Sequence, residues 1–398
     1  MMINKFIFHG VGQGLFYFGS IDNGKFNFVY DCGTFDIIDD RKKIYEKVKE
    51  NIIEGIYKNT KFDFIAISHL HADHINFLPV IIKNLKQDGK IFLPYFPKAK
   101  EYEYAFIAYL IFNGIEPDIN DTDSNTSIFQ YLYTFYIGRR GRNDIPNYNL
   151  VFIGENEEED YPYHQESYLL ENNFPLWYFK FYNKRLKDYR KLETLNDEIK
   201  NLLGSDTIED YLKKDYYNGI KQIKAKFEIK KQDFIDETNI NNQITNATSL
   251  LLLHHPAFGP ATLLTGDIVF DLDLEKRINN GLSKNCEKLE ILQIPHHGCK
   301  DNWDSISGKW KFKPSNLIIS FGWYNSRKHP SSIFYKGIKS KIFKTNQINL
   351  VYYDYNESIP ETDQEQSFAY QIENYWYPLV PLRFYDRWIN RWIIRTID

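Results

Sequence analysis

Short runs of apolar residues recur along the chain and predict a protein built from strands and helices. Several runs alternate apolar and polar residues or are continuously apolar and β-branched, as half-buried and fully buried strands are. The strands predicted in this way cover 3–8, 15–20, 26–31, 62–68, 90–93, 249–254, 261–264, 291–294 and 317–321. Apolar residues at helical spacing predict helices within 37–56, 76–85, 188–231 and 381–397.

The pattern changes between the two groups of strands. From about residue 95 to 242 the chain is aromatic, charged and loop-rich, and we interpret this stretch as a large insertion between two halves of one fold. The predicted units are an N-terminal half at 1–94, the insertion at 95–245, a C-terminal half at 246–355 and a C-terminal extension at 356–398.

The composition limits the classes of protein to consider. The 398 residues are 43% hydrophobic and 26% charged, which favours a sizeable core and argues against wholesale disorder. Because the formal net charge is −4, any basic surface for nucleic acid must be local. Three cysteines without metal-site spacing indicate a reducing compartment. We find no secretory signal and no apolar run long enough to span a membrane, so we expect a soluble, cytoplasmic protein.

The segment from Ser68 to His74, Ser-His-Leu-His-Ala-Asp-His, follows a predicted buried strand. Imidazole and carboxylate groups together suit divalent transition metals such as zinc and manganese. The close spacing lets two alternate histidines face one metal while the following Asp-His pair faces another. A polar loop whose histidines only satisfy hydrogen bonds is the alternative, but four ligand-type residues in six positions favour a site for two cations.

This motif is similar to the His-x-His-x-Asp-His signature of the metallo-β-lactamase superfamily. The chain most resembles one branch, the soluble hydrolase domain of the bacterial competence DNA-uptake channel. Its other motifs occur here in the same order, as Val11-Gly12-Gln13-Gly14, Asp31-Cys32-Gly33, Asn246-Ala247-Thr248-Ser249, Leu264-Thr265-Gly266-Asp267, Pro295-His296-His297-Gly298 and Asn325-Ser326-Arg327-Lys328-His329-Pro330. The resemblance covers 3–94 and 246–335 and implies an α/β fold, the four-layer αββα metallo-β-lactamase sandwich.

The resemblance also implies roles for individual residues. His69 and His71 would bind the first metal, and Asp73 and His74 the second, with Asp267 bridging both. Without the other motifs, the Gly-Asp pair that ends at Asp267 would be interpreted as an ordinary turn.

The superfamily usually has a further metal-binding histidine between the first motif and the bridging aspartate, and no clear candidate stands there. We expect His296 to replace it, with His297 as second choice or as an orienting group in hydrogen-bond contact with a ligand. Asp31 is expected to steady the histidine loop. His329 is a candidate late ligand, general acid or phosphate contact, with plain turn structure as its alternative.

The residue roles implied by the resemblance predict metal-assisted hydrolysis. A hydroxide bridging two zinc or manganese ions would attack the substrate, with Asp73 or Asp267 accepting a proton and His329 or a metal-bound water protonating the leaving group. Relatives in the branch point to a phosphodiesterase or nuclease acting on nucleic acid or a nucleotide. A phosphodiesterase for cyclic nucleotides and a non-catalytic, partner-binding protein are the alternatives. The insertion is a candidate surface for a homodimer or partner protein.

Arginines at 383, 387, 391 and 395 recur every four residues beside Trp388 and Trp392. A basic and aromatic strip for single-stranded nucleic acid is one interpretation. We favour the other, an amphipathic closing helix whose tryptophans pack on the core.

Overall fold

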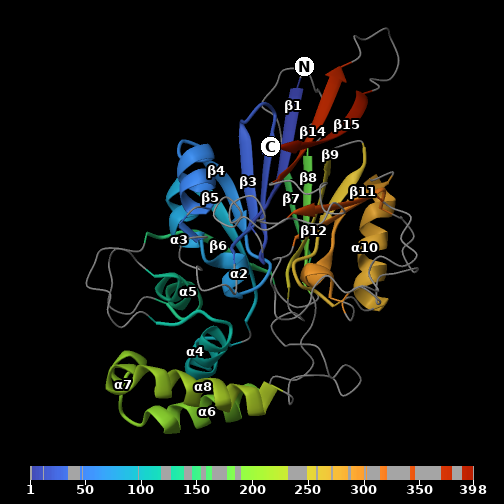
Figure 1. The fold of residues 1–398 in the computed structure, drawn as a ribbon. Helices are drawn as coiled ribbons and strands as arrows, with labels where there is room; N and C mark the ends of the chain where they lie inside the picture. Colours follow the sequence, from blue (N-terminus) through green and yellow to red (C-terminus); the bar gives the residue numbers. More distant parts are fainter. Residues whose placement is uncertain are drawn as a thin grey trace, which may run out of the picture.

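The structure is a computed structural model with a mixed α/β fold, in which two mixed sheets have helices on both sides (Figure 1). It describes residues 2–11, 13–34, 45–46, 48–96, 98–117, 127–138, 146–153, 158–163, 177–183, 190–231, 249–256, 259–269, 272–285, 288–299, 302, 314–320, 341–345, 369–378 and 388–397.

The first sheet has eight strands in the order β15-β14-β1-β2-β3-β4-β5-β6. The strands from β3 to β6 run parallel to one another, and the remaining pairs are antiparallel. Their bounds are β1 Met2–His9, β2 Phe16–Ile21, β3 Phe26–Cys32, β4 Phe62–Ala66, β5 Leu85–Pro94, β6 Asn149–Ile153, β14 Ala369–Pro378 and β15 Trp388–Ile397.

The second sheet has seven strands in the order β13-β12-β11-β10-β9-β8-β7. The neighbouring strands from β10 through β13 pair in parallel, and those from β7 through β10 pair antiparallel. Their bounds are β7 Glu158–Tyr163, β8 Trp177–Tyr182, β9 Leu251–Pro256, β10 Ala261–Leu264, β11 Leu289–Gln293, β12 Asn316–Ser320 and β13 Lys341–Thr345.

Helices cover the outer face of each sheet. Those packed in one core with the first sheet are η1 Lys49–Ile56, α2 Ala72–Ile75, α3 Leu78–Ile81, η2 Ile82–Asn84, α4 Glu103–Phe112, α5 Ile128–Tyr136, α6 Arg190–Leu203, α7 Ile208–Lys214 and α8 Tyr216–Lys231. The second sheet packs against α10, Leu272–Asn285, on the other side of the molecule (Figure 1).

A third core lies between the sheets and is rich in aromatic rings. Phe28 and Phe64 of the first sheet contact Phe179 of the second, with ring centroids 4.9 and 5.1 Å away. His254 is fully buried in this core. The indole of Trp177 is a pure donor, so its 3.2 Å hydrogen bond to Nδ1 places the imidazole proton on Nε2, which donates to Tyr17 Oη at 2.7 Å. His254 is therefore a core residue.

The strands predicted before 95 and after 246 are confirmed. The interval 95–245 supplies three strands, β6, β7 and β8, to the two sheets, in addition to the helices α4 to α8. Helices predicted within 188–231 are confirmed as α6, α7 and α8, whereas 76–85 forms only the short α3 and η2 before β5 begins.

The prediction of a closing helix in 381–397 is wrong for the described part of that range. Trp388–Ile397 is the strand β15, paired with β14 along ten residues. The segment is rich in isoleucine and tryptophan, which favour strands. Positions four apart, such as Arg391 and Arg395, share one side of a strand as well as one face of a helix. Their spacing is therefore equally compatible with a helix and with a strand. Arg383 and Arg387 lie outside the described residues.

No helix among the described residues combines the length and apolar character needed to cross a bilayer.

Burial, and secondarily the neighbouring His255, lowers the pKa of His254 from 6.5 to about 3. The unfolded chain takes up a proton on this residue below pH 6.5 while the folded chain does not. We therefore expect the free energy of unfolding to fall as the pH drops from about 6.5 towards 3. His254→Gln retains one donor and one acceptor and should remove about 1.4 kcal/mol per pH unit of this dependence. Urea unfolding at several pH values between about 3 and 6.5 measures this dependence of the free energy of unfolding on pH. An equal dependence in the variant and the native protein would contradict the lowered pKa of His254.

Candidate metal centre

The histidine motif and its partners come together where strands of both sheets end. Asp31 lies near the end of β3, and the segment from His69 to His74 follows β4 and continues into α2. The second sheet contributes Asp267 after β10 and the pair His296 and His297, in the short helix η4 Pro295–Gly298 after β11. The site is therefore assembled from both halves of the chain.

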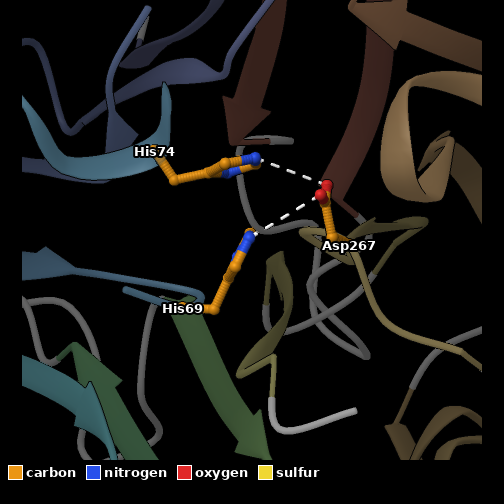
Figure 2. Close-up of side chains that lie close together, drawn as sticks. All are labelled: His69, His74 and Asp267. Carbon is orange, nitrogen blue, oxygen red and sulfur yellow. Dashed lines mark ion pairs between the residues drawn. The ribbon is translucent and has the colours of Figure 1, made fainter. Parts of the chain in front are cut away.

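Asp267 approaches two histidines of the segment that follows β4, His69 in the loop and His74 in α2 (Figure 2). Its Oδ2 lies 3.6 Å from His69 Nε2, and its Oδ1 lies 3.4 Å from His74 Nε2. All three side chains are buried, and their ligand-type atoms lie within 4.8 Å of one another. These residues form one group that could hold a metal ion.

A second such group shares His74 with the first. His74 Nε2 lies 3.9 Å from Asp73 Oδ2, which in turn lies 3.5 Å from His297 Nε2. His297 Nε2 is also 3.9 Å from Asp267 Oδ1, so the two groups are continuous. Asp73 keeps 18% of its side chain exposed, which places it on the open side of the centre.

The two remaining histidines predicted for the site lie on the His69 side. His71 Nδ1 is 2.9 Å from His69 Nε2, and His296 Nε2 is 3.8 Å from Asp267 Oδ2. The two adjacent histidines therefore differ in position. His297 Nε2 lies near Asp73 Oδ2 and Asp267 Oδ1, whereas His296 Nε2 lies near Asp267 Oδ2.

Hydrogen bonds at the far side of each ring fix which nitrogen faces the centre. His74 Nδ1 donates to Asp31 Oδ2 at 2.7 Å, which leaves Nε2 directed at the centre. Ser68 donates its backbone N–H and its hydroxyl to the same Asp31 carboxylate. Since the hydroxyl proton is committed there, Ser68 Oγ accepts from His69 Nδ1 at 2.8 Å. Asp31 thus orients the His74 ring directly and the His69 ring through Ser68.

The His296-His297 pair is held in the same manner. His297 Nδ1 donates to the carbonyl of Ser320 at 2.8 Å. The amide nitrogen of Asn302 donates to the carbonyls of Asp267 and Ile268, so its oxygen is the atom that accepts from His296 Nδ1 at 3.1 Å.

The backbone is strained at three residues of the site, Asp31, His296 and His297. His296 has φ 48° and His297 has φ 54°, both in the left-handed region that non-glycine residues rarely adopt. Asp31 has φ 55°. Such strain persists only where the surrounding structure fixes it, and it is concentrated at functional sites.

The turn before Asp267 is fixed by one buried side chain. Gln293 Oε1 accepts the backbone N–H groups of Thr265 and Gly266, at 2.7 and 2.9 Å. Gly266 has φ 53°, and a Cβ there would meet Ser68 at 2.6 Å. Glycine therefore allows the Asp267 turn to approach the histidine loop closely.

The charge states favour cation binding. Burial lowers the pKa of His69, and it lowers that of His71 to about 4, so both rings are neutral. Burial opposes ionisation of Asp73 and Asp267, but the neighbouring histidines, His74 foremost, hold the pKa of each carboxyl below its usual range.

His74 carries the compensating charge. Burial alone would lower its pKa, yet Asp267, Asp73 and Asp31 together raise it well above 6.5. Two ionised carboxylates at the centre thus depend on a positive charge, which a bound cation would supply in place of the proton.

The residues present fit divalent metal ions. Ligand atoms on one tetrahedral zinc, each about 2.0–2.2 Å from it, lie about 3.3–3.6 Å apart. The nitrogen–oxygen separations of 3.4 to 3.9 Å between the histidines and carboxylates of the centre are close to these values. Among the described residues, His74 Nε2, His297 Nε2 and Asp267 Oδ1 are buried without a hydrogen-bond partner. Buried polar atoms are rarely left so, and a cation would satisfy all three.

Seven predicted ligand residues are therefore brought together: His69, His71, Asp73, His74, Asp267, His296 and His297. His329 lies outside the described residues. So do Lys300, Arg327 and Lys328, basic residues beside the motifs that could either meet a phosphate or be ordinary solvated loop residues. Sequence reasoning missed the orienting roles of Ser68, Asn302 and Ser320. Only Ser68, which adjoins the motif, carried a signal that could have pointed to it.

Comparison with known proteins finds no family model that matches the chain and no similar curated protein.

Gly33 lets the chain pass directly against Asp73. A Cβ at Gly33 would lie 2.3 Å from the carbonyl carbon of Asp73 and 2.5 Å from the nitrogen of His74. We expect Gly33→Ala to lower the free energy of unfolding by about 3 kcal/mol, because backbone must move to admit the methyl group. Gly204→Ala is the control, since nothing lies within 4 Å and only its φ of 65° adds strain, about 1 kcal/mol. Denaturant unfolding measures the free energy of unfolding of both variants. An equal decrease in the two would contradict a steric clash between the added methyl group and the backbone of Asp73.

Proposed function

We propose that this chain is a dinuclear metal-dependent hydrolase of the metallo-β-lactamase fold, acting on phosphodiester bonds. The observation that carries the proposal is the pair of ligand groups that share His74, with unpartnered ligand atoms directed into the space between them. Two mixed sheets with helices on both sides agree with the αββα arrangement of this fold. The resemblance of the sequence motifs points the same way.

The distances at Asp73, His74 and His297, together with the sequence resemblance for His69 and His71, support one division of the ligands. Asp73, His74 and His297 would hold one cation, and Asp267 would contact both. His69 and His71 would hold the other cation, with His296 on the same side of Asp267. Mixed nitrogen and oxygen ligation suits zinc or manganese.

Bound cations would supply a water of lowered pKa and neutralise charge on the phosphate. The chain's own residues contribute acceptors and orientation. Asp73 is ionised and partly exposed, so it is placed to accept a proton from water on the open side. Asp31 holds the His74 ring through Nδ1, which keeps Nε2 available as a ligand atom.

The substrate proposal is a phosphodiester in nucleic acid or a nucleotide. We expect purified protein to bind about two zinc or manganese ions per chain and to cleave at least one of linear DNA, RNA or a cyclic dinucleotide. His74→Ala and Asp267→Asn should each lower the rate by about 100-fold or more, because each residue belongs to the shared centre. His254→Gln, in the core between the sheets, is the matched control and should retain activity. Two bound metals without turnover of any substrate would favour the partner-binding alternative, and no bound metal would overturn the hydrolase.

Asp31→Asn tests whether orientation of His74 matters for the metals. The variant keeps the shape of the side chain but loses the carboxylate that accepts from His74 Nδ1 and Ser68. We expect its affinity for zinc to fall by about 10- to 100-fold. Competition with a chromophoric chelator measures this, with Asp63→Asn as a control carboxylate outside the centre. Equal affinity in Asp31→Asn and the native protein would remove the orienting role.

A further inference from the structure

A cavity of about 460 Å³ opens on the helix-covered face of the first sheet, away from the metal centre. Its lining comes from β1, the β2–β3 hairpin, the end of η1 and the residues just before β4. Lys61 precedes β4, whereas the histidine motif follows that strand, so about 20 Å of extended chain separates the two. Its volume falls within the range of small-molecule sites.

Strand register places polar and apolar residues in two adjacent rows at this cavity. Lys5 pairs directly with Ser20, and Ser20 with Asn27, which forms a polar row across β1, β2 and β3. Ile7 pairs with Phe18 in the next row on the same face. Tyr57, buried and hydrogen-bonded to His9 through its hydroxyl at 2.6 Å, extends this apolar floor.

The charged groups at the cavity leave a positive balance. Lys86 is bound to Asp63 at 2.6 Å, so this pair is neutral. Lys5 and Lys61 also line the cavity, and neither forms an ion pair within the part of the chain that the structure describes. The described lining therefore contains three lysines, Lys5, Lys61 and Lys86, of which Lys86 is paired with a carboxylate. In the backbone register, Glu373 of β14 pairs with Lys5.

We propose that this cavity is a second binding site, for a small organic anion that joins a phosphate or carboxylate to an aromatic or apolar group. The anionic end would lie at Lys5 and Lys61, where Ser20 adds a hydroxyl donor. The aromatic part would cover Ile7, Phe18 and Tyr57. Since no residue of this cavity belongs to the metal centre, the inference stands independently of the proposed hydrolase.

Titration of the metal-free Asp267→Asn protein with adenosine 5′-monophosphate, followed by calorimetry, tests the proposal without competition from the metal centre. We expect one saturable site per chain, with affinity that falls as salt is raised. Inorganic phosphate and adenosine, which each carry only half of the recognised chemistry, should bind more weakly than the nucleotide.

Lysine variants in the same background locate the site. Lys5→Ala with Lys61→Ala should weaken binding of the nucleotide by about tenfold or more, because two charge-assisted contacts are lost. Lys58→Ala is the matched control, since this exposed lysine lies beside Tyr57 in sequence but not in the cavity lining, and it should bind as the parent does. No binding by the parent, or equal binding by the double variant, would overturn the proposal. Either failure would leave hydrolysis by the metal-loaded native protein unaffected.

Discussion

The attraction between buried carboxylates and histidines drawn from both sheets governs the construction of the site. Asp267 follows β10 of the second sheet, and the histidines nearest its carboxylate oxygens, His69 and His74, follow β4 of the first. An ionised carboxylate in this dry environment is costly unless a positive group faces it closely. The carboxylate and imidazole groups that are suited to bind metal therefore also stabilise the contact between the two halves of the chain.

The rigidity of these groups arises from residues with no direct part in ligation. Asp31 and Ser68 orient the histidine loop, while Gln293 fixes the backbone before Asp267. Asp31 and Ser68 each form a hydrogen bond that leaves Nε2 of a histidine directed at the centre, whereas Gln293 accepts backbone N–H groups of the turn. Because these partners are themselves buried, the ligand atoms have little freedom to turn away, which is the preorganisation that tight metal sites require.

Local patterns in the sequence were sufficient to predict many of the strands and the cluster of ligand-type residues. The apolar run before His69 and the spacing within the motif predicted both a buried strand and a cluster of ligand-type side chains after it. The placement of His296 and His297 could not be predicted in this way, because it depends on two consecutive residues in the left-handed region and on hydrogen bonds to Asn302 and Ser320, which lie outside the motif.

Long-range pairing also explains where element prediction failed. Whether the last segment becomes a helix or a strand depends on the presence of β14 beside it, which periodicity alone does not reveal. The contribution of β6 to the first sheet likewise depends on its parallel pairing with β5, more than fifty residues earlier.

The position of β1 has a consequence for biosynthesis. One side of β1 pairs early with β2, but its other side pairs with β14, where Met2 lies opposite Trp376. During translation the backbone donors and acceptors on that side remain unsatisfied until β14, which begins only at Ala369, has left the ribosome. A nascent chain with such an open edge is exposed to pairing with other strands, so its maturation depends on protection from self-association until the C-terminal strands arrive.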